Sequence, residues 1–328
     1  MGLKEIKNLS VVVPVYNEEE ALPIFLPNLI EELDKIKESR NLDYEIILIN
    51  DGSTDKTYQI MKEYASKYRT IKIIHFGNNF GQTAGLAAGF NNAHGDIIVT
   101  LDADSQNDPA DILALIDKLK EGYDVVSGWR KDRKDKFFSR ILPSRTANSL
   151  ISMITGLKLN DYGCTLKAYT KESVQHLHLY GEMHRFIPAL LRWSGATIAE
   201  IPVKHHPRKI GKSKYGISRT IRVLLDLAVI KFLTSFSTRP IQFFGFIGLI
   251  IFIFGCIAFL AMLYFKFHYQ LSMNRNPLLY LSLTSFMMSL QFFILGFIAE
   301  MLSRTYHETQ HKPIYVIKEK INFDAQQE

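Results

Sequence analysis

Cysteine is nearly absent from this chain of 328 residues, which contains only two. Cys164 lies in a polar part of the sequence, whereas Cys256 lies in an apolar stretch near the C-terminus. A disulfide between them is therefore not expected, and a Cys/His metal cluster is excluded. We expect Cys164 to serve only in packing.

The first ten residues, MGLKEIKNLS, lack a long apolar core. A secretory signal peptide needs such a core of about 7 to 15 residues, so this class of leader is not expected here. Any membrane anchor is expected at the C-terminal end instead.

Charges are absent from two stretches of the last third of the chain. Residues 241–265 run for 25 residues without a charge, and residues 278–299 run for 22 more. Each stretch is long enough to cross a hydrocarbon core of about 30 Å as a helix. We predict two transmembrane helices that form a hairpin; a pair of buried core helices is the alternative, although such helices seldom run so long without a charge.

Acidic residues are scarce beside the first apolar stretch. Residues 204–239 contain nine Lys or Arg and a single acid, Asp226, whereas the segment 266–277 between the two stretches contains only two basic residues. The positive-inside rule then predicts a multi-pass protein of the inner (cytoplasmic) membrane, with both flanks of the hairpin in the cytoplasm. The net charge of +6 is concentrated beside the membrane, which favours anionic lipid over nucleic acid as a partner.

Residues 217–236 place Arg219, Arg222 and Asp226 on one helical stripe with apolar residues around the rest. This pattern predicts a helix in the membrane interface, with an ordinary surface helix as the alternative. The expected organisation is a cytoplasmic domain (1–215), a juxtamembrane amphipathic helix (216–239), the two membrane helices (240–303, at about 241–265 and 278–299) and a cytoplasmic C-terminal tail (304–328).

Short apolar runs alternate with helical patterns over the first 130 residues. Strands are expected at 9–13, 44–49, 71–75, 96–101 and 125–127, and helices at 19–37, 56–67, 83–93 and 109–120. This alternation predicts an α/β fold with a doubly wound, mostly parallel sheet. Ligands of such sheets bind beyond the carboxyl ends of the strands, where this chain has PVYNE (14–18), NDGSTD (50–55), DAD (102–104) and SGWR (127–130).

The segment LDADSQNDP, residues 101–109, contains acids of two kinds. Asp102 and Asp104 end a buried strand, where two carboxylates can bind a hard cation such as Mg²⁺ or Mn²⁺, although Asp-x-Asp is also common in turns. Asp108 precedes a proline and Asp111 follows in the first turn, which is the pattern of a helix N-terminus. We therefore assign Asp108 and Asp111 to structure.

Asp51 ends another apolar strand and is followed by Gly52. A carboxylate at this position can accept hydrogen bonds from a ribose or a base edge. A simple Asp-Gly turn is the alternative.

Eight segments in order resemble the inverting family 2 glycosyltransferases of the GT-A fold, in the branch that transfers a sugar to a polyprenyl phosphate. This branch includes dolichyl-phosphate mannosyltransferases and bactoprenol (undecaprenyl) phosphate glucosyltransferases. The resemblance covers the chain from about Leu9 to its end. The segments are VVVPVYNEEEAL, LINDGSTDKT, NNFGQTAGLAAGFNNAHGD, VTLDADSQNDPADI, YDVVSGWR, NDYGCTLKAY, MHRFIPALL and HHPRKIGKSKYG.

The resemblance implies a GT-A sheet followed by an interfacial helix and a two-helix membrane hairpin, and it implies roles for single residues. Catalytic roles fall to Asp104, Arg130 and Asp161. Nucleotide-sugar contacts fall to Pro14, Tyr16, Asn17, Glu18, Asp51, Asp102, Gln106 and Lys212. Binding of the metal, Mg²⁺ or Mn²⁺, is assigned to Asp102, Asp104 and Gln106. Binding of the acceptor phosphate is assigned to Arg130, Arg145 and Arg208. The chain departs from many relatives at Asn78 and Gln82, where Arg and Lys are frequent, so a donor-phosphate role for that loop is not carried over.

Elementary chemistry is consistent with a phosphate acceptor. A phosphate monoester has its second pKa near 6, so it is a dianionic nucleophile at neutral pH and needs no general base. The remaining task is to gather several negative charges, which a divalent cation and a ring of Arg and Lys can perform. Arg130 and Arg145 are expected to hold the acceptor phosphate, whereas the charged residues 131–135 between them also fit a solvated loop.

We therefore expect a non-processive, inverting enzyme that transfers a sugar from a nucleotide diphosphate to polyprenyl (undecaprenyl) phosphate, with UDP-glucose as the preferred donor. GDP-mannose is the alternative donor, and a non-catalytic membrane-anchored scaffold is the alternative class. A processive synthase is disfavoured because Gln-x-x-Arg-Trp is missing: Ala189 precedes Arg192-Trp193. Whether the chain forms a homo-oligomer is left open.

Overall fold

The structure is a computed structural model that describes residues 6–131, 148, 151–153, 155–175, 177, 179, 183–207, 240–270, 272, 276–309 and 316–323. The chain divides into two compact units. One unit comprises the residues up to Ile230 together with those from Pro313 onward, and the other runs from Lys231 to Lys312. The predicted interfacial helix, at 217–236, lies outside the described residues.

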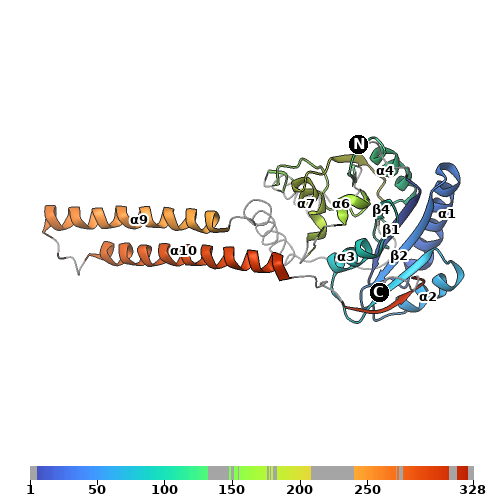
Figure 1. The fold of residues 1–328 in the computed structure, drawn as a ribbon, viewed down its shortest axis with the longest axis horizontal. Helices are drawn as coiled ribbons and strands as arrows, with labels where there is room; N and C mark the ends of the chain where they lie inside the picture. The colour runs from blue at the N-terminus through green and yellow to red at the C-terminus, as the bar shows by residue number, and fades with distance from the viewer. Residues whose placement is uncertain are drawn as a thin grey trace. The chain divides into compact units, whose positions relative to one another are not determined.

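The described residues of the first unit form a sheet of eight strands in the order β7-β5-β6-β4-β1-β2-β3-β8. Figure 1 labels three of its inner strands, β4, β1 and β2. The strands are β1 (Asn8–Val15), β2 (Asp43–Asn50), β3 (Ile71–Phe76), β4 (Ile97–Thr100), β5 (Val125–Trp129), β6 (Lys167–Thr170), β7 (Ile198–Pro202) and β8 (Ile317–Ile321). The helices of this unit are α1 (Leu22–Arg40), α2 (Thr57–Lys67), α3 (Gln82–Asn92), η1 (Pro109–Asp111), α4 (Ile112–Leu119), α6 (Lys171–Val174), η3 (Met183–Arg185) and α7 (Ile187–Trp193).

Helices cover both faces of the sheet, because the strands are apolar on both sides. Val11 and Val13 of β1 belong to the buried core that also contains residues of α1, α2 and α4. Val12 points to the other face, where α3 approaches so closely that a Cβ on Gly89 would lie 2.2 Å from Val12 Cγ1. The prediction of a doubly wound α/β fold is therefore confirmed.

The sheet contains more antiparallel pairs than the predicted, mostly parallel sheet. Four of its seven strand pairs are parallel, namely β1–β2, β1–β4, β2–β3 and β5–β7. Strand β6 enters between β4 and β5 and runs antiparallel to both, and β8 pairs antiparallel with β3 at the sheet edge. Strands β6, β7 and β8 were not predicted, because they lie beyond the first 130 residues, where the regular alternation of apolar runs and helical patterns ends, and β8 follows the apolar hairpin.

The parallel strands β4, β1, β2 and β3 end at one edge of the sheet, since each pairs in parallel with its neighbour in that order. The segments that follow these strands therefore meet there. Three of the segments singled out in the sequence lie there, namely residues 14–18, 50–55 and 102–104.

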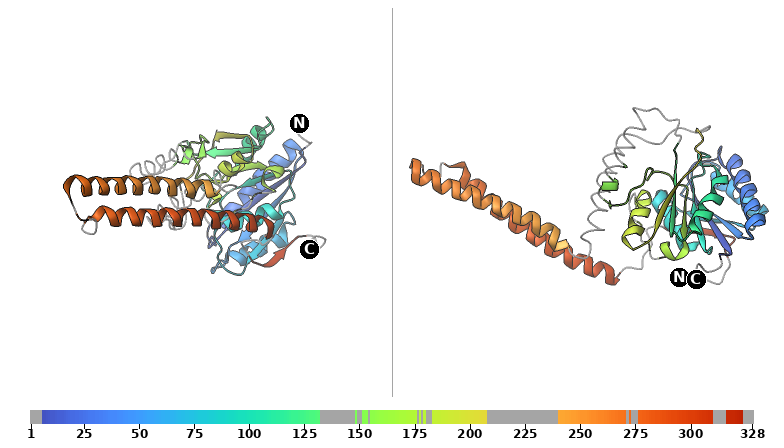
Figure 2. Two further views of the ribbon diagram at one scale, coloured as in Figure 1. Left: turned by 60° about the vertical axis from the view of Figure 1, so that its left-hand side comes forward. Right: turned by 90° about the horizontal axis from the view of Figure 1, so that it is seen from above.

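The second unit is a pair of long helices, α9 (Pro240–Tyr269) and α10 (Pro277–Thr309), which lie side by side (Figure 2). Small residues line their contact: Gly248 lies against Phe293 and the Ser289 carbonyl, and Gly255 lies against Phe286 and Ser285. Residues 243–269 and 277–299 are long and apolar enough to cross a membrane. The α10 helix continues to Thr309, into the predicted C-terminal tail.

Candidate active site

The loop after β2 and the loop after β3 interlock at the carboxyl edge. Gly52 has φ +66°, and a Cβ there would lie 2.5 Å from the Asn78 carbonyl carbon, so both the backbone conformation and the close approach require glycine. Asp51 is buried, and its two carboxylate oxygens accept the backbone N–H groups of Phe80 (2.7 Å) and Gly81 (2.9 Å). Burial raises the pKa of Asp51, while these two hydrogen bonds lower it.

Asp51 therefore holds the β3–α3 loop in place, a role that the sequence did not indicate. A carboxylate oxygen can accept more than one hydrogen bond. The nucleotide contact expected of Asp51 thus stays a prediction, for a carboxylate that the backbone N–H groups of Phe80 and Gly81 orient.

The loop after β1 is bound to the loop after β2. Asn17 adopts a left-handed φ of 52°, its backbone N–H donates to Ser53 Oγ (3.0 Å) and its Oδ1 accepts the Thr54 N–H (2.8 Å). The Glu18 backbone N–H donates to Thr57 Oγ1 at 2.8 Å. Pro14 belongs to β1 itself, opposite Ile49 in the register. The structure thus brings Pro14, Asn17, Glu18 and Asp51 together at one edge, with partly buried Tyr16 in the same loop.

Asp102 and Asp104 follow β4, as predicted, and lie close enough to repel. Burial raises the pKa of Asp102 to about 7, and the Asp104 carboxylate adds to this shift; the Thr165 side chain and the charges of Arg130 and Lys167 oppose it. The Gln82 side-chain amide donates to Asp102 Oδ1 at 2.8 Å. Gln82 therefore contacts this acidic pair directly.

A divalent cation would fit these two carboxylates. Two carboxylates held close together repel each other, and a bound cation neutralises this repulsion. Within the described part of the chain no group of three or more His, Cys, Asp or Glu side chains could hold a metal ion. Mg²⁺ is usually bound through one or two carboxylates while substrate phosphates supply further ligands.

Gln106 and Asp108 connect the acidic segment to the chain around His205. The Gln106 N–H donates to Asp104 Oδ1 (3.1 Å), and the Gln106 carbonyl accepts the His206 N–H (2.8 Å). Asp108 accepts the Ala110 N–H (3.1 Å), which confirms it as the predicted N-cap of η1, and also accepts from His206 Nε2 (3.2 Å). Asp111 accepts the Lys204 N–H at 2.6 Å, so its structural role is also confirmed.

These contacts bring residues 204–206 beside the acidic segment. The predicted basic residues Arg208 and Lys212 follow within a few positions but lie outside the described residues, as does Arg145. Their expected contacts with phosphate remain predictions.

Arg130 and Asp161 form a buried, two-pronged ion pair. Arg130 Nε and Nη2 donate to the two Asp161 carboxylate oxygens at 2.7 and 3.0 Å, and the side chains are only 15% and 4% exposed. Burial opposes the charge of the guanidinium, yet the pairing with Asp161 raises the pKa of Arg130 overall. Both residues were predicted to act in the site, and the structure places them in direct contact.

Lys167 is a buried cation of this site that the sequence analysis missed. It is 3% exposed on β6, its Nζ donates to the Cys164 carbonyl oxygen, and its charge acts on Asp102, Asp161 and Arg130. Burial lowers its pKa. Cys164 itself is buried, and burial raises the pKa of its thiol to about 11, so a packing role is confirmed.

Comparison with known proteins gives a consistent result. Residues 10–177 match glycosyl transferase family 2. The chain is 40% identical to dodecaprenyl-phosphate galacturonate synthase from Rhizobium johnstonii, over 97% of this chain and 94% of that protein. It is 33% identical to undecaprenyl-phosphate 4-deoxy-4-formamido-L-arabinose transferase from Photorhabdus laumondii, over 98% and 96% of the two chains.

Among solved structures, glucosyl-3-phosphoglycerate synthase from Mycobacterium tuberculosis has a similar fold. Its complex with Mn²⁺, UDP and glucosyl-3-phosphoglycerate matches with a TM-score of 0.52 at 19% identity, covering 70% of this chain and 79% of that chain. A second complex of the same protein, with phosphoglyceric acid, also has a TM-score of 0.52, at 18% identity. The two chains therefore share the GT-A fold.

Proposed function

This chain belongs to glycosyl transferase family 2, and from that premise we propose that it transfers a sugar from a nucleotide diphosphate to a polyprenyl phosphate. The observation that carries the proposal is the grouping of Asp102 and Asp104 with the Arg130–Asp161 pair, in which the charge of Arg130 acts on Asp102. Two carboxylates can bind a divalent cation for the donor diphosphate, and a guanidinium can bind the acceptor phosphate. The names of the two relatives, which act on dodecaprenyl and undecaprenyl phosphate, support the lipid acceptor.

Catalysis in this proposal is positioning and charge stabilisation. Asp102 and Asp104, with Gln106 beside them, would hold a Mg²⁺ or Mn²⁺ ion, which when bound neutralises charge on the leaving diphosphate. The acceptor phosphate is already ionised at neutral pH, so no side chain needs to remove a proton. The phosphate oxygen attacks the anomeric carbon in one displacement, with inversion and without a processive second step.

Arg130 is proposed to bind the acceptor phosphate, with Asp161 as the residue that orients it. A guanidinium held through Nε and Nη2 is fixed in its plane and keeps further N–H donors for a second anion. Arg145 and Arg208 are proposed to assist it, and Lys212 to contact the donor. Asn17, Asp51 and their neighbours are proposed to bind the nucleotide.

We also propose which nucleotide sugar is the donor. UDP-glucose is the donor expected from the sequence, with GDP-mannose as its alternative. The galacturonate in the name of the relative with 40% identity makes a nucleotide-linked galacturonate a further donor to test.

We also propose that α9 and α10 anchor the enzyme in the inner membrane as a two-span hairpin. Strand β8 follows α10 in the chain and pairs with β3, and the residues up to Ile230 and those from Pro313 onward belong to one folded unit. A hairpin with two crossings returns the chain to its starting side, and the excess of Lys and Arg in residues 204–239 supports the cytoplasm as that side.

The test is direct. The full-length protein in detergent is incubated with undecaprenyl phosphate, Mg²⁺ or Mn²⁺, and labelled UDP-glucose, GDP-mannose or a nucleotide-linked galacturonate, and the extracted lipid is counted. Label is expected in an acid-labile lipid with one donor and is expected to disappear with EDTA. An Asp102→Asn variant serves as the inactive control. Absence of lipid-bound label with every donor would overturn the proposal and favour a non-catalytic scaffold.

A further inference from the structure

We propose that the C-terminal strand β8 positions the nucleotide-binding loop between β2 and α2, and that Tyr58, His75 and Asn50 connect the two. This inference rests on the proposed function, because it assigns the loop of residues 51–55 to the nucleotide. It adds three positioning residues, each lying outside the set expected to touch a substrate.

Strand β8 is firmly docked on the sheet. It pairs antiparallel with β3, and the register shifts between His75 and Phe76, with Glu319 opposite His75. Just beyond the strand, the Asn322 side-chain amide donates to the carbonyl oxygens of Ala65 (2.9 Å) and Ile71 (2.8 Å). Docking thus involves both β3 and the end of α2.

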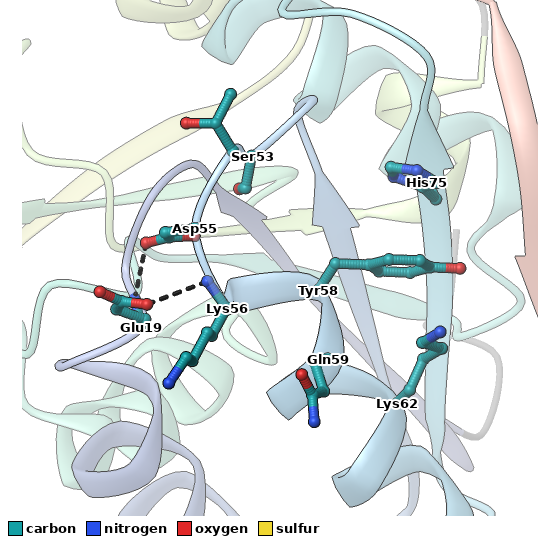
Figure 3. Close-up of a pocket in the computed structure, with 9 residues that line it drawn as sticks. Glu19, Ser53, Asp55, Lys56, Tyr58, Gln59, Lys62 and His75 are labelled. Atoms are coloured by element: carbon teal, nitrogen blue, oxygen red, sulfur yellow. Dashed lines mark hydrogen bonds between the residues drawn. The ribbon is translucent and has the colours of Figure 1, made fainter.

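The first link joins β8 to an aromatic pair. The Tyr58 hydroxyl donates to Glu319 Oε2 at 2.5 Å, and the Tyr58 ring stacks on the His75 ring with centroids 4.1 Å apart and planes inclined by 17°. Figure 3 shows the two rings one above the other, Tyr58 from α2 and His75 from β3. The position of the His75 ring therefore depends on a contact with the C-terminal strand.

The second link joins His75 to the end of β2. Asn50 is fully buried, and its Nδ2 lies 2.9 Å from His75 Nδ1. The Asn50 Oδ1 accepts the Ser53 N–H at 3.1 Å, which fixes the orientation of the amide and makes Nδ2 the donor toward His75. His75 Nδ1 must then be an acceptor, so the neutral ring belongs to this arrangement.

The surroundings of His75 favour the neutral ring. Burial lowers the pKa of His75, and the charges of Lys318 on β8 and Lys62 on α2 act in the same direction, while Glu319 opposes them. In a protonated ring Nδ1 would also carry a hydrogen, so it could not accept the hydrogen bond from Asn50 Nδ2.

The third link reaches the nucleotide-binding loops. The Ser53 N–H is held by Asn50, and the Ser53 hydroxyl accepts the N–H of Asn17 at 3.0 Å. Asp51, whose carboxylate is proposed to contact the nucleotide, directly follows Asn50 in the chain. A displacement of Asn50 would therefore move both loops at once.

The rings are not fixed by close packing alone. A cavity of ≈ 860 Å³ lies beside them, lined among others by Ser53, Lys56, Tyr58, Lys62 and His75 (Figure 3). Because one side of the aromatic pair borders this space, the stack and the hydrogen bonds to Glu319 and Asn50 determine where the rings lie. Removal of one of these interactions should loosen the loop without unfolding the sheet.

The test uses conservative variants of the full chain. Tyr58→Phe removes the bond to Glu319, and His75→Phe keeps the ring but removes the acceptor for Asn50. Each is expected to raise the KM for the nucleotide sugar by about three- to ten-fold, as loss of one hydrogen bond predicts, with kcat and the acceptor KM within about two-fold. Tyr44→Phe is the matched control, since the Tyr44 hydroxyl donates to Asp34 Oδ1 (2.6 Å) at the start of β2, whereas the loop follows the last residue of that strand.

A second readout does not depend on activity. Amide hydrogen exchange over residues 51–57 is expected to accelerate in Tyr58→Phe and His75→Phe, but not in Tyr44→Phe, while exchange in β1 and β4 is unchanged. Unchanged exchange in both variants, or an equal change in Tyr44→Phe, would overturn the inference. If the wild-type protein uses no nucleotide sugar, the proposed function fails, whereas the exchange measurement still decides whether β8 supports this loop.

Discussion

Single charged side chains of the site are held by partners before any substrate binds. Both oxygens of Asp51 accept backbone N–H groups, and both oxygens of Asp161 accept from Arg130. Groups that are oriented in advance do not have to be ordered when the reaction occurs, which is the main advantage of a preorganised site. The acidic pair differs, because Asp102 and Asp104 repel each other and gain most from a bound cation.

The Arg130–Asp161 pair gives a prediction at this scale. Arg130→Ala should raise the acceptor KM and lower turnover, and Asp161→Asn should lower kcat/KM for the lipid by about ten-fold or more, because a buried guanidinium loses its charged partner. The donor KM should stay within about two-fold in Asp161→Asn. Steady-state kinetics with varied undecaprenyl phosphate provide the measurement.

The matched control is another Arg–carboxylate pair. Arg40 donates to both oxygens of Asp117 at 3.2 and 2.6 Å, but these side chains are 40% and 43% exposed, and exposed pairs contribute little. Asp117→Asn should therefore leave acceptor kinetics unchanged. Equal kinetics of Asp161→Asn and the wild type would contradict an orienting role for Asp161.

Structural roles of single residues could be predicted from the sequence where the partner lies nearby in the chain. The N-cap at Asp108 could be recognised because its partner, the Ala110 N–H, is two positions away. The partners of Asp51 are 29 and 30 positions away. Nothing in the sequence distinguishes Lys167 from an exposed strand lysine, and its burial follows only from the position of β6 between β4 and β5. Such contacts depend on the fold, and one sequence without aligned relatives does not contain them.

At the level of elements, the interior strands could be predicted and the late ones could not. Strands β1 to β4 are largely apolar and are separated by helical patterns, which is typical of a sheet covered on both faces. Strand β8 has the sequence IKEKI, and its three central residues are exposed. Such a pattern is equally typical of a surface segment, so only its pairing with β3 identifies it as part of the sheet.

Glu45 ties three strands together at the opposite end of the sheet. It accepts from Ser10 on β1 (2.5 Å) and from the His94 N–H (2.7 Å), and it pairs with Lys72 on β3 (2.7 Å). Burial opposes ionisation, but these partners together lower the pKa of Glu45. This carboxylate thus prefers to be charged in the folded protein.

The lowered pKa of Glu45 determines how the stability of the protein depends on pH. A folded pKa below the unfolded value of about 4.3 means that the stabilisation is complete above that pH and is lost as the pH falls through the folded pKa. Glu45→Gln should lower stability by about 1–3 kcal/mol at pH 7, and its Tm should fall less between pH 5 and 3 than that of the wild type. Thermal unfolding in detergent at several pH values measures both. Parallel Tm curves for the two proteins would contradict the assignment.

At the scale of the whole molecule, the decisive feature is that the chain leaves the catalytic unit, forms the α9–α10 hairpin and returns. The hairpin could be predicted from its two charge-free stretches. The return could not, because β8 has no feature of its own that specifies β3 as its partner.

The proposed topology can be tested with single cysteines. Cys164 and Cys256 are first replaced by Ser, and Ser272→Cys, between the two helices, or Lys318→Cys, on β8, is then introduced. A membrane-impermeant thiol reagent should label the cysteine at position 272 in intact cells, and should label the one at position 318 only after the cells are opened. Labelling of both positions in intact cells would contradict a two-span hairpin.

The pairing of β8 with β3 also has a consequence for the order in which the protein matures. Tyr58 and Glu319 are separated by 261 residues, and a ribosome completes β8 only after both hydrophobic helices have been made. The edge of β3 stays open during all of that time, and a chain released early keeps it open. If β8 supports the nucleotide-binding loop, the enzyme becomes fully competent only once its anchor has been synthesised, so incomplete chains in the cytosol would bind little nucleotide sugar.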